Sequence, residues 1–315
     1  MRGAVALLLA TLLPALPSAE ERAVAVTAVA VEVTPDALSG VRQRQTWQLM
    51  ADSEDFGGFS ALLLREERFI ALTDRSVWMV GRYRPDDAAG PLAEVRMSPM
   101  AAEVAPEGAD DRDAEALAAA CETVAIAFER DHRIAWQGAG GAEGATTLRP
   151  APLADLPFNG GIEGLATMPH DCDLILAIGE DQLEGLGVDG GHPVFLFRAG
   201  EAEPVARTTL PPIGPHGVTA AEFGPYGRLY VLFRHWSRQT GTNIRLRRYT
   251  VPPDETLEFD AGETLAEWGR DSGIDNMEAI ALWQDAAGRT RIAILSDDNF
   301  NAPRQRTLLI DLLVE

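Results

Sequence analysis

The sequence predicts an all-β fold, a single β-propeller of four-stranded antiparallel blades, with five blades marked in the sequence and a sixth possible. The first observation is a repeated pattern in which a turn-rich stretch leads into an apolar run that ends on charged residues. The pattern occurs five times, at residues 68–75, 124–130, 174–181, 228–234 and 291–299. Each run has the length and apolar composition of a buried strand.

The second observation is a marker residue that lies 14 to 19 residues before the charged end of each run. The five markers are Ser60, Glu115, Glu163, Thr219 and Glu278, and they are 55, 48, 56 and 59 residues apart. A period of about 40–55 residues with several short strands per unit is typical of propeller blades. The spacing therefore assigns one marker to each blade.

The first 19 residues form a signal-peptide pattern. Arg2 is followed by an apolar stretch over 4–13 and then by small residues and prolines up to Ala19. This stretch is shorter than the roughly 20 residues that span a bilayer. We therefore expect a cleaved signal peptide over 1–19, a propeller domain over 20–315, no membrane span, and a periplasmic or secreted mature protein.

Both ends of the chain are expected to meet in the last blade. After the fifth run only residues 306–314 remain, which is enough for one more strand. The segment 41–50, ahead of the first marker, can supply the missing outer strand and close the ring. Residues 24–33 also have the composition of a strand, but the sequence does not assign that strand a place.

The segment 218–269 shows how one blade is built. Residues 218–223 and 228–233 are apolar strands, and the turn between them contains the Gly and Pro that tight turns favour. Residues 243–251 alternate polar and apolar, as a half-exposed strand does, and 263–268 supplies a fourth strand. Four antiparallel strands ordered from the inside to the outside make one blade.

The charge balance limits the possible functions. The 315 residues include 48 acidic and 27 basic ones, a net charge of −21, and every basic residue is an arginine. An acidic protein does not suit nucleic acid, whose phosphates need cations. The lack of lysine excludes a Schiff base and a lysine general base. Arginine, whose planar fork fits carboxylate and phosphate, is left as the fixed cation.

The chain contains two cysteines, Cys121 and Cys172. They follow the markers Glu115 and Glu163 by six and nine residues, so both fall in the same turn of neighbouring blades, on the face opposite the markers. An oxidising compartment permits a disulfide between them. Two buried free thiols are the alternative, and both possibilities remain open.

Propeller geometry brings the markers and the charged ends of the runs to one face, because the first strand of a blade starts where the second strand ends. Glu115, Glu163 and Glu278 are then expected near the central channel, beside the carboxylates and arginines from different blades. Three interpretations compete. The oxygen atoms could hold Ca²⁺, the arginines could bind an anion while a carboxylate does acid–base work, or the charges could form ion pairs between blades without further function.

Several motifs resemble those of the phytase-like propeller family, described as having esterase-like activity of phytase. They are residues 57–62 with 73–75, 161–165, 276–280 with 295–300, and 305–309. The pair 276–280 with 295–300 is the most specific, although Ala279 stands where the family more often has Gly. The resemblance covers residues from about 41 to the C-terminus. It implies a secreted bacterial β-propeller that hydrolyses esters or phosphoesters; calcium-dependent phytases have six blades, against the five markers counted here.

Together these points predict metal-assisted hydrolysis of an ester or phosphoester at the acidic, arginine-lined face. Three sets of residues are expected to act there: the catalytic carboxylates Glu115, Glu163 and Glu278; the substrate-binding residues Arg75, Arg130, Arg234 and His235; and possible Ca²⁺ ligands Asp74, Asp297, Asp298 and Asn299. The expected substrate is a small anionic or ester compound, and no partner protein is inferred. The alternative is a non-catalytic periplasmic ligand-binding or scaffold propeller, which the lack of a Gly-x-Ser-x-Gly nucleophile motif favours.

Overall fold

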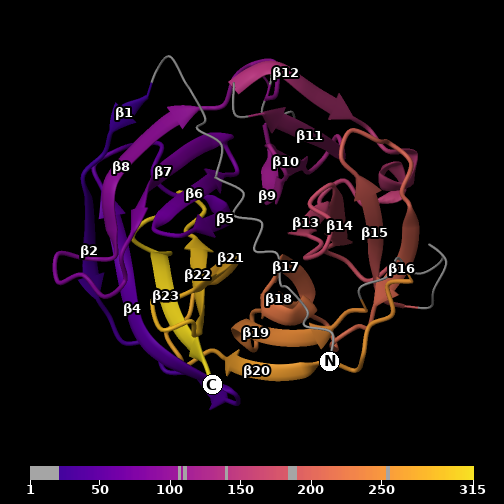
Figure 1. The fold of residues 1–315 in the computed structure, drawn as a ribbon. Coiled ribbons are helices and arrows are strands. Elements are labelled where there is room, and N and C mark those ends of the chain that lie inside the picture. The colour runs from indigo at the N-terminus through magenta and orange to yellow at the C-terminus, as the bar shows by residue number, and fades with distance from the viewer. Residues whose placement is uncertain (1–20, 106–107, 109–111, 139–140, 184–189, 253–255) are drawn as a thin grey trace, which may run out of the picture.

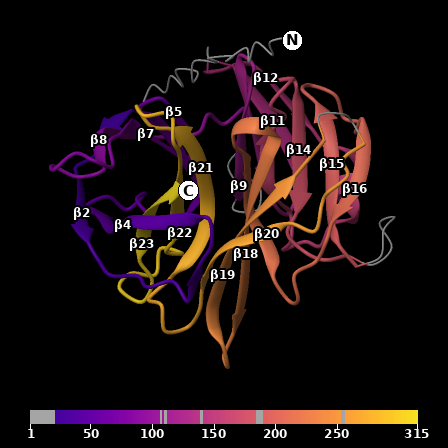
Figure 2. The same cartoon turned by 60° about the horizontal axis from the view of Figure 1, so that its bottom comes forward.

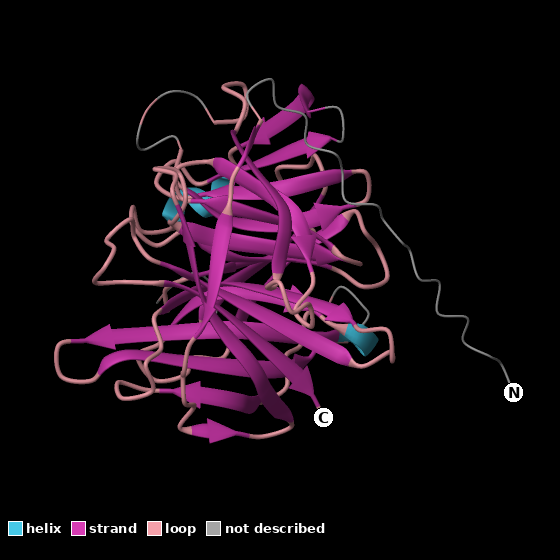
Figure 3. Ribbon diagram, turned by 90° about the vertical axis from the view of Figure 1, so that its left-hand side faces the viewer, coloured by secondary structure: helices cyan, strands magenta, loops and turns pink. Residues whose placement is uncertain are grey.

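The computed structural model describes residues 21–105, 108, 112–138, 141–183, 190–252 and 256–315, and these form a ring of five antiparallel sheets (Figure 1). Strands make up nearly all the regular structure, as Figure 3 shows, and the helical parts described are two 3₁₀ turns, Ala151–Asp155 and Pro225–Gly227. The inner strands β5, β9, β13, β17 and β21 contact one another in a closed cycle. The predicted propeller is therefore confirmed with five blades, and the six-blade alternative is wrong.

Each blade is named here by its place along the chain, and its strands are given from the centre outward. Blade 1 is β5 (Phe59–Arg65), β6 (Arg68–Thr73), β7 (Val77–Tyr83), β8 (Leu92–Pro99) and β1 (Arg22–Ala23). Blade 2 is β9 (Ala114–Ala120), β10 (Thr123–Phe128), β11 (Arg133–Gly138) and β12 (Gly141–Leu148). Blade 3 is β13 (Ile162–Thr167), β14 (Leu174–Gly179), β15 (His192–Arg198) and β16 (Ala206–Leu210). Blade 4 is β17 (Gly217–Phe223), β18 (Arg228–Ser237), β19 (Gly241–Thr250), β20 (Glu263–Trp268) and β3 (Ala37–Leu38). Blade 5 is β21 (Asn276–Gln284), β22 (Thr290–Asp297), β23 (Thr307–Val314), β4 (Val41–Ala51) and β2 (Val26–Ala30).

The N-terminal segment closes the ring, as the sequence predicted. Strand β4 pairs antiparallel with β23, from Leu49 opposite Thr307 to Val41 opposite Val314. The strand that the sequence could not place is β2, which pairs with the outer side of β4. The short strands β1 and β3 add to blades 1 and 4. One short stretch of chain therefore ties three blades together.

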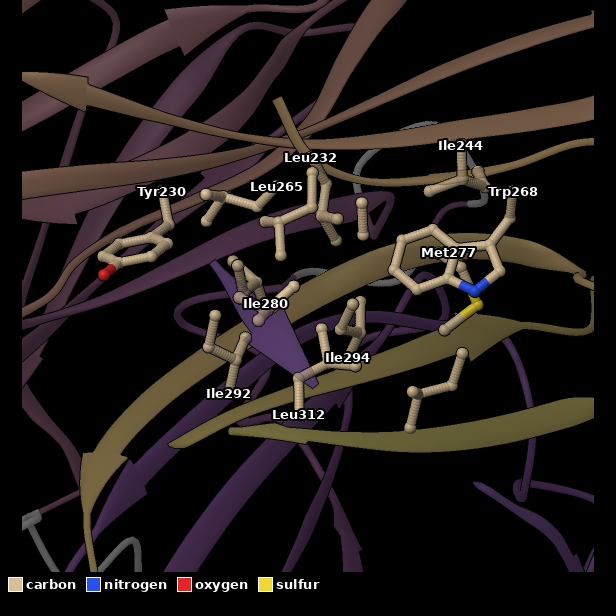
Figure 4. Packing of buried hydrophobic residues seen from close by; sticks show 14 of the residues in the cluster. Tyr230, Leu232, Ile244, Leu265, Trp268, Met277, Ile280, Ile292, Ile294 and Leu312 are labelled. Atoms are coloured by element: carbon tan, nitrogen blue, oxygen red, sulfur yellow. The ribbon is translucent and has the colours of Figure 1, made fainter. Parts of the chain in front are cut away.

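The hydrophobic core is divided into five clusters, one between each pair of neighbouring blades. Figure 4 shows the cluster between blades 4 and 5, where Leu232 and Trp268 from one sheet face Ile280 and Ile294 from the other. The inner-blade strands carry apolar residues on both faces because each sheet has a neighbour on either side. Apolar burial of this kind fixes the angular position of every blade, and so of every residue at the centre.

A disulfide between Cys121 and Cys172 joins blades 2 and 3, with the two Cα atoms 4.9 Å apart. Cys121 follows the end of β9, and Cys172 lies in the turn between β13 and β14. Glu115 and Glu163 stand at the opposite ends of the same inner strands. The structure thus decides the open question in favour of the bridge, and the predicted position away from the acidic residues is confirmed.

Replacing both cysteines by serine is expected to lower the free energy of unfolding by about 4 kcal/mol, because the bridge closes a loop with a sequence separation of 51 residues in the unfolded chain. Denaturant unfolding of the two proteins measures this difference. As a direct check, thiol titration of the unfolded, unreduced protein should find no free thiol; two free thiols per chain would contradict the bridge.

The predicted signal peptide, residues 1–19, lies outside the described residues. Among the residues that are described, no helix is both long and apolar enough to cross a membrane.

Candidate functional site

The five marker residues are the bulged residues of the five inner strands. In blade 1, Phe59 and Ala61 pair with consecutive residues of β6, so Ser60 between them has no pairing partner. The pairing of the other inner strands skips Glu115, Glu163, Thr219 and Glu278 in the same way. A bulge adds one residue to a strand and redirects its side chain. The repeat found in the sequence is thus a set of five bulges, one on each of the inner strands that lie around the centre of the ring in Figure 1.

The two hydroxyl markers hold neighbouring blades together. Ser60 Oγ donates a hydrogen bond to the carbonyl of Ala114 (2.5 Å), the residue before Glu115. Thr219 Oγ1 donates to the carbonyl of Met277 (2.9 Å), the residue before Glu278. Because each hydroxyl is engaged with the next inner strand, neither is free to act as a nucleophile. The three glutamates at the equivalent positions are left to line the channel.

Carboxylates gather around these bulges in two triads that share one residue. One oxygen atom from each of Asp113, Glu115 and Glu129 lies within 4.8 Å of the others, and the same holds for Glu129, Glu163 and Glu180. Glu129 and Glu180 directly follow the second strands of blades 2 and 3, and Asp113 directly precedes β9. We call the end of the channel lined by these residues, together with Asp74, Glu278 and Asp297, the acidic mouth.

The crowded carboxylates have raised pKa values. Burial is the largest cause for Glu115 and Glu163, whose pKa values lie well above the ordinary range, and neighbouring carboxylates add to it. Burial, together with the charges of Asp113 and Glu180, raises the pKa of Glu129 to about 7. Glu163 is only 7% exposed and forms no hydrogen bond or ion pair among the described residues. A buried acid that forms no hydrogen bond or ion pair, and that only the more distant charge of Arg234 favours, is a costly feature that a bound cation would offset.

Two of the predicted substrate-binding arginines are engaged within this site. Arg234 lies 2.9 Å from Glu278 and 3.3 Å from Glu180, and so links blades 3, 4 and 5. Arg130 lies 2.9 Å from Asp113. Asn276 donates from Nδ2 to Glu278 Oε1 (2.8 Å) and to Asp297 Oδ2 (3.3 Å). These groups orient carboxylates, which reduces their own capacity to bind a substrate.

Asp298 joins the first and last blades. Its Oδ1 accepts hydrogen bonds from the backbone N–H groups of Gly58 (3.1 Å) and Phe300 (3.0 Å), and its Oδ2 accepts one from Thr307 Oγ1 (3.0 Å). A Cβ on Gly58 would lie 2.2 Å from the Phe300 ring, and the positive φ of +59° there also favours glycine. Asn299 is exposed in the turn, where its N–H donates to Asp297 Oδ1 (2.6 Å).

A pocket of about 520 Å³ opens beside the acidic mouth, between blades 1 and 2. Its lining includes Asp74, Arg75, Arg112 and Asp113. Burial and the charge of Asp113 raise the pKa of Asp74 to about 7, and Asp74 Oδ1 is buried without a hydrogen-bond partner among the described residues. The volume is within the usual range for small-molecule sites. The pocket therefore places a carboxyl group that can exchange a proton near neutral pH next to the first carboxylate triad.

His235, the fourth predicted substrate-binding residue, points elsewhere. Successive residues of a strand project to opposite faces, so His235 turns away from the side taken by Arg234. Its ring centroid lies 5.6 Å from that of His216. Both belong to blade 4, whose β18–β19 hairpin extends beyond the neighbouring strands in Figure 2. The described contacts give His235 no place in the acidic mouth.

The far end of the channel is bridged by an ion pair. Arg65 at the end of β5 lies 3.2 Å from Glu222 in β17, and these strands belong to blades 1 and 4, which are not neighbours in the ring. Glu222 also accepts a hydrogen bond from the N–H of Leu282 in blade 5 (2.6 Å). Burial raises the pKa of Glu222 to about 7, while Arg65 opposes the shift. The two ends of the channel thus differ. Carboxylates line one end, and at the other end an ion pair joins two blades that are not neighbours.

The markers and the charged ends of the runs therefore meet at one end of the channel, as expected. The carboxylates that lie close enough together to share a cation, however, are not the predicted Ca²⁺ ligands. Glu115 and Glu163 lie in the triads, whereas Asp298 and Asn299 serve the turn between β22 and β23. Asp113 and Arg112 were not anticipated because they precede a strand instead of ending one. In blades 1, 2 and 3 the carbonyl of the residue before the inner strand accepts a hydrogen bond from the N–H of the residue after the second strand, as Asp113 does from Glu129 (2.8 Å). The position of Asp113 beside a charged run end could have been inferred from this pairing.

Without metal, the protein is expected to lose stability as the pH rises from about 4 to about 8. The folded-state pKa values of Asp74, Glu129 and Asp297, about 7, 7 and 8, exceed the ordinary values of 3.8, 4.5 and 3.8. Between these limits the folded protein holds protons that the unfolded chain has released, so the free energy of unfolding falls with pH, by roughly 3 kcal/mol after solvent screening.

Denaturant unfolding in chelator at each pH measures this slope. Saturating calcium should flatten it, because a cation offsets the repulsion of the ionised carboxylates. A stability that rises with pH in chelator would contradict the interpretation.

Comparison with known proteins gives one family. The family model described as phytase-like, "Esterase-like activity of phytase", matches residues 54–300. No curated protein matches the sequence. Among solved structures, the catalytic domain of Coprinopsis cinerea GH62 α-L-arabinofuranosidase is similar with a TM-score of 0.50 and 11% identity, over 90% of this chain and 96% of that one. The glutaminyl cyclase of Myxococcus xanthus gives a TM-score of 0.45 and 12% identity, over 87% and 97% of the two chains. These similarities concern the fold alone.

Proposed function

Because this chain belongs to the phytase-like family, we propose that it hydrolyses an ester or phosphoester with the help of a cation, most simply Ca²⁺, bound at the acidic mouth. The observation that carries the proposal is the state of Glu163. Its carboxyl group is buried, has no partner among the described residues, and lies in a triad whose oxygen atoms come within 4.8 Å of one another. A hard cation that prefers oxygen ligands fits this arrangement.

Glu129, Glu163 and Glu180 are the residues that would hold the cation, and Asp113 and Glu115 extend the same group through Glu129. When bound, the cation supplies Lewis-acid chemistry: it polarises the ester oxygen and stabilises the negative charge that develops there. In this proposal Glu163, one of the three glutamates first expected to be catalytic, becomes a metal ligand, with Glu115 in the adjoining triad and Glu278 outside both. Asp298 then serves as a brace between blades and Asn299 as a turn residue, outside the set of ligands.

Asp74 is the group best suited to proton transfer. It lines the pocket next to the triads, its Oδ1 has no hydrogen-bond partner among the described residues, and its pKa of about 7 matches a neutral working pH. In the proposed reaction Asp74 takes a proton from the attacking water. Burial raises the pKa of Glu278, while Arg234 and Asn276 oppose that rise, and Glu278 keeps Arg234 fixed beside the triads.

The proposed location is the periplasm or the exterior of the cell. The Cys121–Cys172 bridge supports an oxidising compartment, since disulfides persist there and are rare in the cytosol. The signal-peptide pattern of residues 1–19 supports the same location.

A non-catalytic binding or scaffold propeller is the second candidate. It is favoured by the engagement of the Ser60 and Thr219 hydroxyls with backbone carbonyls, which leaves neither of these two residues as a nucleophile. In that case the cation at the acidic mouth would only stabilise the fold.

Turnover of a chromogenic phosphoester and of a chromogenic carboxyl ester by purified protein separates the two candidates. Each ester is tested with calcium and with chelator, and the metal content of the protein is measured alongside. The proposed hydrolase turns over at least one ester in calcium, and chelator removes that activity. Bound calcium with no turnover of either ester, in a folded protein, would leave the binding propeller as the answer.

A further inference from the structure

The arginines around the acidic mouth fall into two groups. Arg130 and Arg234 lie within ion-pair distance of carboxylates. Arg75 and Arg112 form no ion pair with any described residue, although the chain has a net charge of −21. Both line the pocket of about 520 Å³ between blades 1 and 2. The lining of this pocket also includes the carboxylates of Asp74 and Asp113, and the charge of Arg75 acts on Asp74 without a direct ion pair.

The guanidinium group of Arg75 stacks on the ring of Phe300. The central carbon of its guanidinium group lies 3.4 Å from the centroid of the Phe300 ring. The backbone of Phe300 is fixed by the hydrogen bond to Asp298 described above, and its ring packs where Gly58 leaves room. A guanidinium group stacked on a ring keeps its N–H groups in the plane and available at its edge. The seam between blades 1 and 5 therefore orients Arg75, and no described residue accepts a hydrogen bond from its guanidinium group.

Arg112 is held next to Arg75 by backbone contacts. Its NH2 group donates to the carbonyl of Arg75 (2.9 Å), and Ser76 Oγ donates to the carbonyl of Arg112 (2.5 Å). The Nε atom of Arg112 is buried and has no hydrogen-bond partner among the described residues. An unsatisfied buried donor of a charged group is costly unless a ligand accepts from it. Two like charges fixed side by side, one with an unused donor, form a built site for an anion.

Arg75 and Arg112 lie close to the carboxylate triads, because they share a pocket with a member of one triad. Asp113 lines the pocket and also belongs to the triad with Glu115 and Glu129. A ligand that fills the pocket therefore lies against the proposed cation site.

We propose that Arg75 and Arg112 form an oxyanion subsite, which binds a carboxylate or phosphate group of the substrate while its ester bond lies at the carboxylate triads. The selectivity for anionic esters rests on the proposed function, whereas binding of the anion does not. Planar, bidentate contacts from arginine to carboxylate or phosphate are the interactions expected there.

Anion binding tests the subsite directly. Inorganic phosphate and malonate are titrated separately into the metal-free protein by calorimetry. The two titrations show whether the subsite prefers a phosphate or a carboxylate. Arg75→Gln and Arg112→Gln are each expected to weaken binding of the preferred anion about tenfold or more. Arg149→Gln is the matched control, because Arg149 is exposed, follows β12 at the same end of blade 2 and does not line the pocket.

Failure of the subsite and failure of the proposed hydrolase give different results. If both arginine variants fold and bind phosphate and malonate as the wild type does, or if the wild type binds neither anion, the subsite is wrong whatever the turnover. If binding depends on both arginines but no ester is hydrolysed, the subsite stands and the hydrolase does not. With turnover, the variants should raise KM for an anionic ester about tenfold, change kcat little, and leave a neutral ester unaffected.

Discussion

Replacing Glu163 by glutamine is expected to remove the calcium response of the protein and to lower ester turnover by at least about 100-fold. The substitution keeps the size of the side chain but removes one charged oxygen from the triad with Glu129 and Glu180. The metal-free variant should at the same time be more stable than the wild type at pH 8, by about 1–2 kcal/mol, because a buried carboxyl group that repels Glu180 and Glu278 becomes neutral.

Two measurements on the same samples check this expectation: denaturant unfolding with and without calcium, and turnover. A ligand at 100 times its Kd stabilises the folded state by about 2.7 kcal/mol, and this increment should vanish in Glu163→Gln. Glu122→Gln is the control, since Glu122 is exposed beside Cys121 at the opposite end of the blade. A Glu163→Gln protein that keeps the full calcium increment would overturn the assignment of the triad as the metal site.

Replacing Asp298 by alanine is expected to lower the free energy of unfolding by about 3–5 kcal/mol, equally with and without calcium. The carboxylate of Asp298 accepts hydrogen bonds from Gly58, Phe300 and Thr307, and the alanine would leave these donors unsatisfied at the seam between blades 1 and 5. The calcium increment should persist because Asp298 lies outside the triads.

This experiment separates the two roles considered for Asp298. Asp298→Asn retains one acceptor oxygen and should recover part of the lost stability if the residue is a brace. If instead calcium ceases to stabilise both variants, then Asp298 is a metal ligand, as the sequence first indicated, and the proposed cation site must move toward Asp297.

The sequence predicted the plan of the ring because the relevant signals are local and repeated. Short apolar runs of strand composition recur at blade spacing, and the truncated last blade requires the N-terminal strand that β4 supplies. The same periodicity placed Glu115, Glu163 and Glu278 at equivalent positions near the start of the inner strands. An oxidising compartment and the location of both cysteines in the same turn of neighbouring blades made a disulfide possible. The sequence spacing alone did not decide between a bridge and two free thiols.

The identity of the carboxylate groups could not be read in this way. Arg130 and Arg234 look like free cations in the sequence, yet the approach of other blades pairs them with Asp113, Glu180 and Glu278. Arg112 looks like one more loop residue, yet its contact with the backbone of Arg75 sets it in the pocket. Such pairings depend on distances between segments that are 17 to 54 residues apart, which no single-strand pattern contains.

The sequence by itself determined the number of marked blades, the strand that closes the ring, and the face on which the acidic residues meet, because alternation, spacing and turn composition act along the chain. Tertiary structure alone decided that the five markers are bulges, that Glu163 forms no hydrogen bond or ion pair with a described residue while Glu278 contacts Arg234 and Asn276, and that Asp298 joins blades 1 and 5. The physical reason is that burial, hydrogen bonding and charge pairing are set by the neighbouring blades once the apolar clusters have fixed their angles.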